Sequence, residues 1–364
     1  MPGEGPGEGP AQFAGEGSGE GDPVSLDAWV HRWWAGETGA AGHALRIALA
    51  PAEAAFRAGV ALRNRGYDAG WLRSERVDVP VISVGNVAVG GAGKTPFAAW
   101  LGARLREWGR RPAIVLRGYG EDEIIVHREL NPDIPVFRGA RRIDPAREAV
   151  AAGCDVLVLD DAFQHRALAR DLDLVLVAVD GWSTRPRVLP RGPWREGTQA
   201  LGRADLIVLT RKSAGAAQAR EVAAEVSRLH PGKPIVQVAL RPVGLVPLGG
   251  GARMPLDALA GRSIVAIAAL ATPGPYVQHL REAGAEMEPA LYPDHHAFSA
   301  RDVAEIVKRS AGRWMVMTHK DAVKLRLLLP DSTRAYVLEQ SVAIESEADV
   351  LDAALRRVVR ERAR

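Results

Sequence analysis

Apolar and polar positions between Val79 and Arg241 alternate between two patterns. Short runs rich in Val, Ile and Leu predict strands, and longer stretches with apolar residues at helical spacing predict helices. The expected strands are 80–86, 112–117, 134–137, 155–160, 173–179, 204–210 and 235–240, and the expected helices are about 95–108, 144–152 and 214–229. Because strands that alternate with helices form parallel sheets covered on both faces, this part of the chain predicts an α/β fold with a mainly parallel sheet.

A second alternation of the same kind follows a stretch rich in glycine and proline. Residues 242–260 predict a linker, because Gly and Pro interrupt regular structure between Pro242 and Pro255. Beyond it, the pattern predicts strands 263–269, 286–291, 313–318 and 334–338 and helices 275–283, 299–310 and 346–361. We therefore expect a larger α/β domain at 73–241 and a smaller one at 261–364, with an active-site cleft between them.

The first 72 residues show two different patterns. Residues 1–24 carry Gly-Glu-Gly-Pro repeats and too few apolar residues to offset chain entropy, so they predict a disordered tail. Residues 25–72 predict an amphipathic segment in which Pro51 interrupts or begins a helix. Its apolar positions are Trp29, Trp33, Trp34, Leu45, Leu49, Ala52, Phe56 and Val60. Either the segment packs on its own domain, or it lies at a membrane interface with its tryptophans at headgroup depth.

Composition and charge narrow the class of protein. The chain has 364 residues, is 47% hydrophobic and 25% charged, and is typical of a globular protein with two domains. Its formal charge of +3 rises to +8 without the five acidic residues of the first 22, which favours anionic partners. The single cysteine, Cys154, forms no internal disulfide and fits a reducing cytoplasm. No apolar run reaches 18 residues and the start is acidic, so neither a spanning helix nor a signal peptide is expected.

The stretch from Val81 to Pro96 runs from a β-branched apolar segment through a glycine cluster to Lys94-Thr95 and the start of a helix. This order is typical of a nucleotide-phosphate site, in which glycine amides face the phosphates, the lysine reaches the terminal phosphates and the threonine hydroxyl binds Mg²⁺. Ala88 stands where the G-x-x-x-x-G-K-[ST] pattern has its first glycine. The alternative is a glycine-rich turn that only packs a helix on a strand.

A second phosphate-site signal is the run Val156 to Asp161. A buried strand that ends in Asp160-Asp161 places a carboxylate beside the glycine loop, where it can hold Mg²⁺ directly or through water. Acids also end strands as simple turn residues, so this signal gains its weight from Lys94-Thr95 upstream. Together the two signals predict the fold class more closely: a P-loop NTPase-type, mainly parallel sheet domain with a second, smaller α/β domain.

Three further clusters offer groups for catalysis or binding. Arg117-Gly118-Tyr119-Gly120 follows a strand, and Asp122-Glu123 comes directly after it. Pro293-Asp294-His295-His296 precedes a helix that Ser299 can cap, so it is either a capping loop or a site where an acid orients a basic histidine. Thr318-His319-Lys320-Asp321 loosely matches the Thr-Lys-x-Asp element that reads a nucleotide base, and is otherwise a solvated turn.

Taken together, these segments resemble the tetraacyldisaccharide 4′-kinase family, the lipid A kinases of Gram-negative bacteria. The resemblance spans about residues 26–340. Its motifs are Val-Gly-Asn-Val-Ala-Val-Gly-Gly-Ala-Gly-Lys-Thr-Pro at 84–96, Arg-Gly-Tyr-Gly at 117–120, Asp-Glu at 122–123, Asp-Asp-Ala-Phe-Gln-His at 160–165, Leu-Pro-Arg-Gly-Pro-Trp-Arg-Glu at 189–196, Tyr-Pro-Asp-His-His-Ala-Phe at 292–298 and Thr-His-Lys-Asp-Ala-Val-Lys-Leu at 318–325. The chain departs from the family pattern at Ala162, which replaces Gly, at His319, which replaces Glu, and in a shorter segment before Asp122.

The resemblance implies an activity and a substrate. In this family ATP phosphorylates the 4′-hydroxyl of the distal glucosamine of a tetraacylated disaccharide 1-phosphate, giving lipid IVA at the cytoplasmic face of the bacterial inner membrane. The implied cofactors are ATP and Mg²⁺, and the implied partners are the lipid A disaccharide 1-phosphate and the inner-membrane surface. We expect a peripheral, monomeric enzyme that binds no nucleic acid, with residues 25–72 as its membrane-associating segment.

The resemblance also implies roles for residues of this chain. Lys94 stabilises the transferring phosphoryl group, and Asp122 acts with His295 as the base that takes the proton of the sugar hydroxyl. The residues implied to bind the nucleotide are Gly90, Gly91, Gly93, Lys94, Thr95, Arg142 and Gln164. The residues implied to hold Mg²⁺ are Thr95, Asp160, Asp161 and Glu123, and His165 is implied to support the site.

Two other classes of protein share part of this pattern. A regulatory or assembly GTPase has the same loop, and would use Thr318 to Asp321 to read guanine. A nucleic-acid-binding ATPase is suggested only by the basic charge, and the Lys and Arg residues are dispersed rather than clustered. We therefore rank the kinase first, the GTPase switch second and the nucleic-acid-binding ATPase last.

Overall fold

The computed structural model describes residues 26–118 and 121–361, so the expected tail at 1–24 and Tyr119-Gly120 lie outside the described residues. In this part of the chain one sheet has eleven strands in the order β3-β2-β4-β1-β5-β6-β7-β11-β10-β8-β9. The strands are β1 (Val81–Asn86), β2 (Pro112–Leu116), β3 (Val136–Arg138), β4 (Val156–Leu159), β5 (Leu172–Ala178), β6 (Leu206–Arg211), β7 (Ile235–Pro247), β8 (Ser263–Ala269), β9 (Glu286–Tyr292), β10 (Trp314–Met317) and β11 (Ala335–Ser346).

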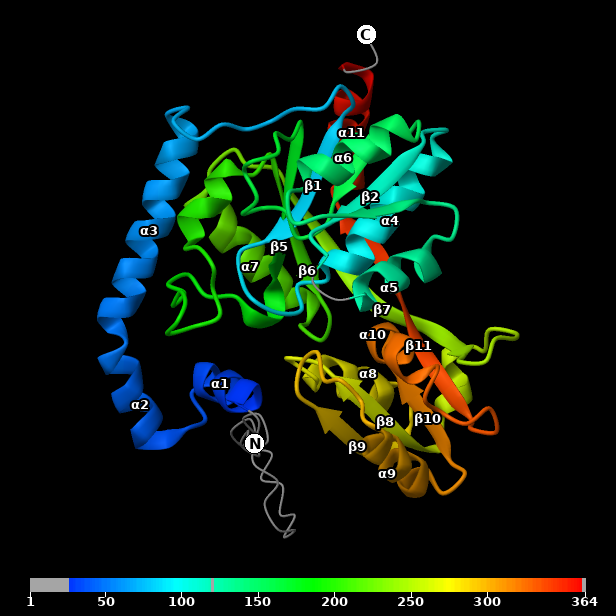
Figure 1. Cartoon of the computed structure of the whole chain (residues 1–364). Helices are drawn as coiled ribbons and strands as arrows, with labels where there is room; N and C mark the ends of the chain where they lie inside the picture. Colours follow the sequence, from blue (N-terminus) through cyan, green and yellow to red (C-terminus); the bar gives the residue numbers. More distant parts are fainter. Residues whose placement is uncertain (1–25, 119–120, 362–364) are drawn as a thin grey trace, which may run out of the picture.

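Helices cover this sheet and extend beyond it (Figure 1). They are α1 (Leu26–Ala35), α2 (Gly39–Ala48), α3 (Ala50–Asp68), α4 (Lys94–Glu107), α5 (Asp122–Leu130), α6 (Ile143–Ala151), α7 (Ala216–Leu229), α8 (Gly274–Glu282), α9 (Ala300–Ser310), α10 (His319–Leu325) and α11 (Ala348–Glu361). The pattern of apolar positions missed two short helices, α5 and α10, which carry Asp122 and Lys320.

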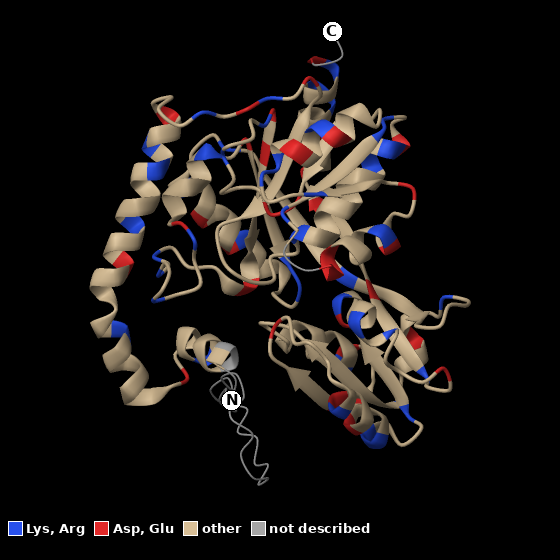
Figure 2. Cartoon of the chain, in the orientation of Figure 1, with Lys and Arg blue, Asp and Glu red and all other residues tan. Residues whose placement is uncertain are grey.

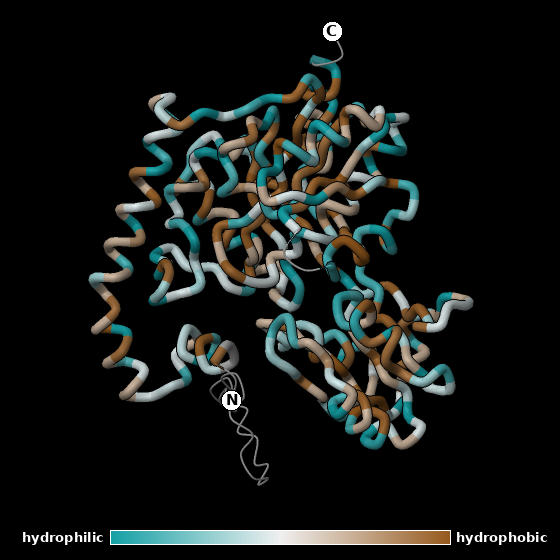
Figure 3. Tube along the Cα trace, in the orientation of Figure 1, coloured by the Kyte–Doolittle hydropathy of each residue, from teal (hydrophilic) through white to brown (hydrophobic). Residues whose placement is uncertain are grey.

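The larger half of the molecule contains strands β1 to β7, which pair in parallel along the sheet. Every residue of β1, β2 and β4 is buried, because α4 and α11 pack on one face of the sheet and α6 and α7 on the other. The continuous Val, Ile and Leu runs suit strands that are covered on both sides. Figure 3 shows these hydrophobic segments gathered at the centre of the larger half. The expected mainly parallel α/β sheet is confirmed.

The expected linker at 242–260 is wrong in its first part, because β7 continues to Pro247. Along this length β7 pairs antiparallel with β11, so a two-stranded ribbon joins the halves. Pro242 is tolerated because it lies opposite Gln340, next to a register shift where the ladder is interrupted. Gly244 is required because a Cβ atom there would lie 2.7 Å from the carbonyl oxygen of Met254. The glycine and proline therefore mark a bulged strand rather than a loop.

The smaller half contains β8 to β11 with α8, α9 and α10. Ser299 caps α9 as expected, since its hydroxyl accepts from the Asp302 N–H and Asp302 completes a capping box. The expected division at residue 261 differs from the structure at the end of the chain. Helix α11 leaves the smaller half and packs through Leu351 and Leu355 into the core of the larger half. The helical pattern predicted α11 but not the half on which it packs.

Helix α3 lies along one side of the larger half, and α2 and α1 continue beyond its end, with α1 turned in beneath the larger half (Figure 1). Pro51 begins α3. The buried Glu53 carboxylate holds α3 in place, since it accepts from the Val188 N–H at 2.9 Å and from Arg191 at 2.7 Å. Trp33 is only 3% exposed, so it packs within the protein. None of the described helices combines the length and apolar character needed to cross a membrane.

Candidate active site

The glycine loop lies between β1 and α4, at the C-terminal ends of the parallel strands. Gly93 adopts a left-handed φ of 79° as the N-cap of α4, and Gly90 has a φ of 99°. A Cβ atom on Gly93 would lie 2.1 Å from Leu240 Cδ1, so only glycine fits there. Asn86 holds the loop by donating to the Ala88 carbonyl oxygen at 2.6 Å. Backbone N–H groups at a helix start attract anions, so this loop suits a phosphate.

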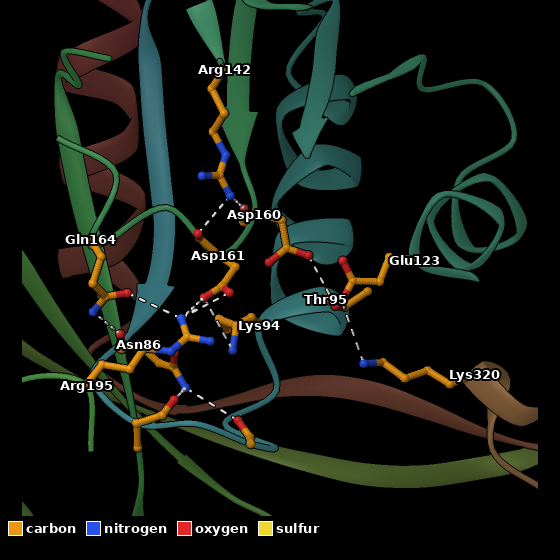
Figure 4. A network of polar contacts seen from close by, with 12 residues as sticks. Asn86, Lys94, Thr95, Glu123, Arg142, Asp160, Asp161, Gln164, Arg195 and Lys320 are labelled. Carbon is orange, nitrogen blue, oxygen red and sulfur yellow. Dashed lines mark hydrogen bonds and ion pairs between the residues drawn. The ribbon is translucent and has the colours of Figure 1, made fainter. Parts of the chain in front are cut away.

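Asp160 directly follows β4 and lies at the first turn of α4 (Figure 4). Its Oδ2 accepts from the Thr95 hydroxyl at 3.1 Å and lies 3.0 Å from His127 Nε2. Burial raises the pKa of this carboxyl, but the contact with His127 and the charge of Lys94 together hold it below its ordinary value. Asp160 Oδ1 is buried and has no hydrogen-bond partner among the described residues. The Thr95 hydroxyl and the ionised Asp160 carboxylate, with its unpartnered Oδ1, are oxygen ligands of the kind that Mg²⁺ prefers. This ion binds few protein ligands and completes its coordination shell with phosphate and water.

Asp161 turns away from Asp160 with a left-handed φ of 50°. Its carboxylate lies 3.5 Å from Lys94 Nζ and accepts from Arg195 Nη1 at 2.8 Å. Although burial raises the pKa of Asp161, these two cations lower it below the ordinary value. Gln164 accepts from the same Arg195 nitrogen at 3.3 Å and donates to the carbonyl oxygen of the loop residue Asn86 at 2.9 Å. Asp161 therefore holds the lysine and the arginine beside the glycine loop.

Arg142 and Glu123 approach the acid pair from two sides. Arg142 is buried and donates to the carbonyl oxygens of Asp160 and Asp161, both at 2.8 Å, so it fixes the main chain at the strand end. Glu123 lies 3.9 Å from Lys320 Nζ (Figure 4). Burial and the nearby Asp160 raise the pKa of Glu123. Both residues line the cavity described below.

Asp122 and His295 come from different halves and meet at the edge of the site. Asp122 begins α5, and its Oδ2 lies 3.7 Å from His295 Nδ1 and 3.7 Å from Lys324 Nζ. The contact with His295 lowers the pKa of Asp122 to about 2, against the effect of burial. The same contact raises the pKa of His295. His295 is half-exposed, and its Nε2 lies 4.0 Å from Asp294 Oδ2.

One cavity of about 890 Å³ unites these groups. It lies between the two halves and takes its walls from the glycine loop, the ends of β4 and β6, α10 and the loop after β9. Lys94, Asp160 and His295 all line it, and Asp122 lies directly behind His295. The residues to which the resemblance gives a role and that line the cavity are Gly90, Gly91, Gly93, Lys94, Thr95, Glu123, Arg142, Asp160, Asp161, Gln164, His165 and His295. From the further clusters named in the sequence, Arg117, Asp294, Thr318, His319 and Lys320 also line it.

The sequence did not identify three functional residues: two that line the cavity and one that contacts Asp160 from behind. His127 holds Asp160 from the buried side of α5, where its spacing looks like that of a core residue. Arg195 pairs with Asp161, and its place in the segment at 189–196 was a usable signal. Lys212 follows β6 and lines the cavity, and no motif marks it.

The expected base-reading element has a different role in the structure. Thr318 to Asp321 form the start of α10 rather than a solvated turn. Asp321 is fully buried and accepts from the Thr318 hydroxyl at 2.6 Å and from the Ala269 N–H at 3.2 Å. Its Oδ2 accepts both bonds within the smaller half, and Asp321 is not among the residues that line the cavity, as a guanine-reading acid must be. The GTPase alternative thus loses the feature that suggested it.

The fold and the site define a P-loop phosphotransferase, with a glycine loop, a lysine and a strand-end carboxylate at the C-terminal edge of a parallel sheet. Residues 45–127 and 120–360 match the family model described as tetraacyldisaccharide-1-P 4′-kinase. The chain belongs to this family.

Similar proteins cover nearly the whole chain. Tetraacyldisaccharide 4′-kinase of Anaeromyxobacter dehalogenans (strain 2CP-C) is 39% identical over 355 residues, which cover 89% of this chain and 93% of the relative. The enzyme of the same name from Syntrophus aciditrophicus (strain SB) is 38% identical over 315 residues, covering 76% and 84%. A crystal structure of LpxK from Aquifex aeolicus in complex with ATP matches with a TM-score of 0.69 at 28% identity, covering 86% of this chain and 99% of that chain.

Proposed function

We propose that this kinase transfers the γ-phosphoryl group of ATP to the 4′-hydroxyl of tetraacyldisaccharide 1-phosphate through the residues of the shared cavity. The observation that best supports this is that Lys94, Asp160 and His295 line one cavity, although they come from three distant parts of the chain. Phosphoryl transfer needs the reacting groups to be positioned and the phosphate charge to be neutralised. A glycine loop, a lysine, a metal-binding carboxylate and a histidine supply these needs together.

The nucleotide phosphates lie on the amides of Gly90, Gly91 and Gly93, with Lys94 at the transferring group. The absence of side chains at the glycines lets the backbone approach the phosphates closely. Asp161 and Arg195 hold Lys94 at the loop through their ion pairs. Arg142 and Gln164 act on the same site through the backbone, since both bond to carbonyl oxygens of its strands and loops.

Thr95 and Asp160 would hold Mg²⁺, and Glu123 and Asp161, which line the same cavity, are the further candidate ligands. When bound, the ion neutralises charge on the β- and γ-phosphate oxygens. The buried, unpartnered Oδ1 of Asp160 supports this assignment, because an unsatisfied carboxylate oxygen is costly to bury. His127 orients the carboxylate from behind.

His295 accepts the proton of the sugar hydroxyl. Its Nδ1 faces Asp122, so Nε2 is the ring atom left to take the proton. Asp122 remains ionised, orients the ring and stabilises the imidazolium that forms. The hydroxyl oxygen then bonds to the γ-phosphorus as the bond to the β-phosphate oxygen breaks, so ADP leaves and the proton stays on His295.

We place the enzyme, as a monomer, at the cytoplasmic face of the inner membrane. The support is that the substrate carries acyl chains and that the N-terminal helices present apolar side chains to solvent. Ile47 of α2 and Leu62 of α3 are 62% and 65% exposed, and Trp71, which follows α3, is 76% exposed. Trp33 and Trp34 do not serve as headgroup anchors, since Trp33 is buried and Trp34 donates to the Pro190 carbonyl oxygen. The dispersed Lys and Arg residues in Figure 2 do not favour nucleic acid as a partner.

The direct test is phosphorylation of tetraacyldisaccharide 1-phosphate in detergent micelles by the full chain with ATP and Mg²⁺, followed by mass spectrometry of the lipid. We expect one added phosphate on the lipid and a strong preference for ATP over GTP. Folded protein that binds ATP but adds no phosphate to the lipid would contradict the proposed substrate.

A further inference from the structure

Lys212 occupies a position that two halves of the molecule fix. It follows β6, and the Asp180 carboxylate accepts from the N–H groups of Lys212 at 3.0 Å, Ser213 at 2.9 Å and Ala214 at 2.8 Å. From the smaller half, the buried His279 on α8 places Nε2 2.9 Å from the Lys212 carbonyl oxygen. The main chain that carries Lys212 is therefore held from both sides.

The side chain of Lys212 points at the glycine loop. A Cβ atom built on Gly91 would lie 2.9 Å from Lys212 Nζ, so the ammonium group lies against the loop backbone. Lys212 lines the same cavity as Lys94 and Asp160. Within the described part of the chain, its ammonium group makes no hydrogen bond and no ion pair with another side chain.

Burial lowers the pKa of Lys212 to about 8. The nearby cations Lys94 and Lys320 lower it further, and Asp180 acts in the opposite direction. A cation that is enclosed beside two other cations is unstable without a neutralising anion. The glycine loop on which it lies binds such an anion, because its backbone amides attract phosphate.

We propose that Lys212 is a second cationic contact for the nucleotide's phosphates, in addition to Lys94. The ammonium group lies beside Gly91, one of the glycines on which the phosphates are proposed to lie. Lys212 also joins nucleotide binding to the smaller half through His279. The inference rests only on the ATP-binding part of the proposed function and not on the identity of the lipid.

Calorimetric titration of the full chain with ATP and with AMP, without lipid, tests the assignment. We expect Lys212→Met to weaken ATP binding about ten- to a hundred-fold, as for loss of a charge-assisted contact, and AMP binding far less. Lys212→Arg should restore most of the ATP affinity. The matched control is Lys308→Met, which removes the same charge from an exposed position on α9.

Two results for Lys212→Met would overturn the assignment. One is an equal loss of affinity for ATP and for AMP, and the other is an ATP affinity within twofold of wild type. Should Lys212→Met fail to fold, as judged by its circular dichroism and thermal melt, the pH dependence of ATP binding decides. Wild type should lose affinity as the pH rises through about 8, and Lys212→Arg should not. Parallel pH profiles in the two proteins would also overturn it.

The two proposals fail separately. If the wild-type enzyme binds ATP with the predicted dependence on Lys212 but adds no phosphate to the lipid, the proposed lipid substrate is wrong and Lys212 keeps its role. If the wild-type enzyme phosphorylates the lipid and Lys212→Met binds ATP normally, the lipid substrate is right and the role of Lys212 is wrong.

Discussion

The two walls of the cavity are built differently. On the phosphate wall, Asp160 is buried and is held by both Thr95 and His127, and all three residues belong to the larger half. On the opposite wall, His295 is half-exposed and lies in a loop, where its own φ is left-handed at 57°. Its Nδ1 lies 3.7 Å from Asp122 Oδ2 of the other half. Asp160 and the two residues that hold it thus come from one half, whereas the base exists only where the two halves meet.

The contact between α5 and α10 sets how closely the halves approach. Lys324 and Lys320 of α10 lie 3.7 Å from Asp122 and 3.9 Å from Glu123, respectively. Helix α5 therefore supplies both the partner of the base and the attachment of the smaller half. The difference between the walls predicts that damage to the phosphate wall affects nucleotide binding and chemistry together, and that damage to the base wall affects chemistry alone.

The largest effect is expected from Lys94→Ala. We expect kcat/KM for ATP to fall roughly 10³-fold, because the substitution removes charge neutralisation in both the bound state and the transition state. It also leaves Asp161 with Arg195 as its ion-pair partner, so the fold should survive. Steady-state kinetics with lipid substrate checks the effect, with thermal melting as the control for folding. A variant with near-normal kcat/KM would show that the phosphate wall does not act through Lys94.

His295→Ala should lower kcat about 10²-fold and leave ATP affinity unchanged, since removal of a general base slows proton transfer without touching the nucleotide. His296→Ala is the matched control. That neighbouring ring stacks on Tyr292 and lies outside the residues that line the cavity. The test is to measure kcat and ATP affinity in both variants and to compare them. An equal loss of ATP affinity in His295→Ala would remove the distinction between the walls.

The pH dependence of kcat sharpens the assignment of the base. His295 must be neutral to accept a proton, and contact with Asp122 raises its pKa above the ordinary 6.5, so turnover should fall as the pH drops through that raised value. Asp122 has a pKa of about 2 and stays ionised throughout. Asp122→Asn should lower the alkaline plateau about tenfold and move the acid limb to lower pH. An acid limb that does not move would exclude His295 as the titrating base.

Sequence reasoning predicted the phosphate wall better than the base wall, for a physical reason. Lys94 and Thr95 begin the helix that follows β1, and Asp160 directly follows β4; the ends of parallel strands meet at one edge of the sheet whatever the details of packing. The pairing of Asp122 with His295 follows from how two halves dock, and only the family resemblance indicated it. His127 and Lys212 act through tertiary contacts that no local pattern encodes. Pro242 and Gly244 predicted a linker because glycine and proline occur both in loops and in bulged strands, and only the pairing with β11 tells the two apart.

The smallest effect is expected where the halves touch at the surface. Arg326, directly after α10, pairs with Glu129 of α5, and partly exposed pairs of this kind contribute about 0–1 kcal/mol. Glu129→Gln should therefore change the free energy of unfolding by about 1 kcal/mol or less and kcat by no more than about twofold, because Lys320 and Lys324 still bridge the same helices. Denaturant unfolding and turnover measure the two quantities. The contrary outcome is a loss of kcat as large as that of His295→Ala, with ATP affinity intact. That result would mean that the single pair of Arg326 and Glu129 holds His295 in position, and that the two lysines of α10 do not.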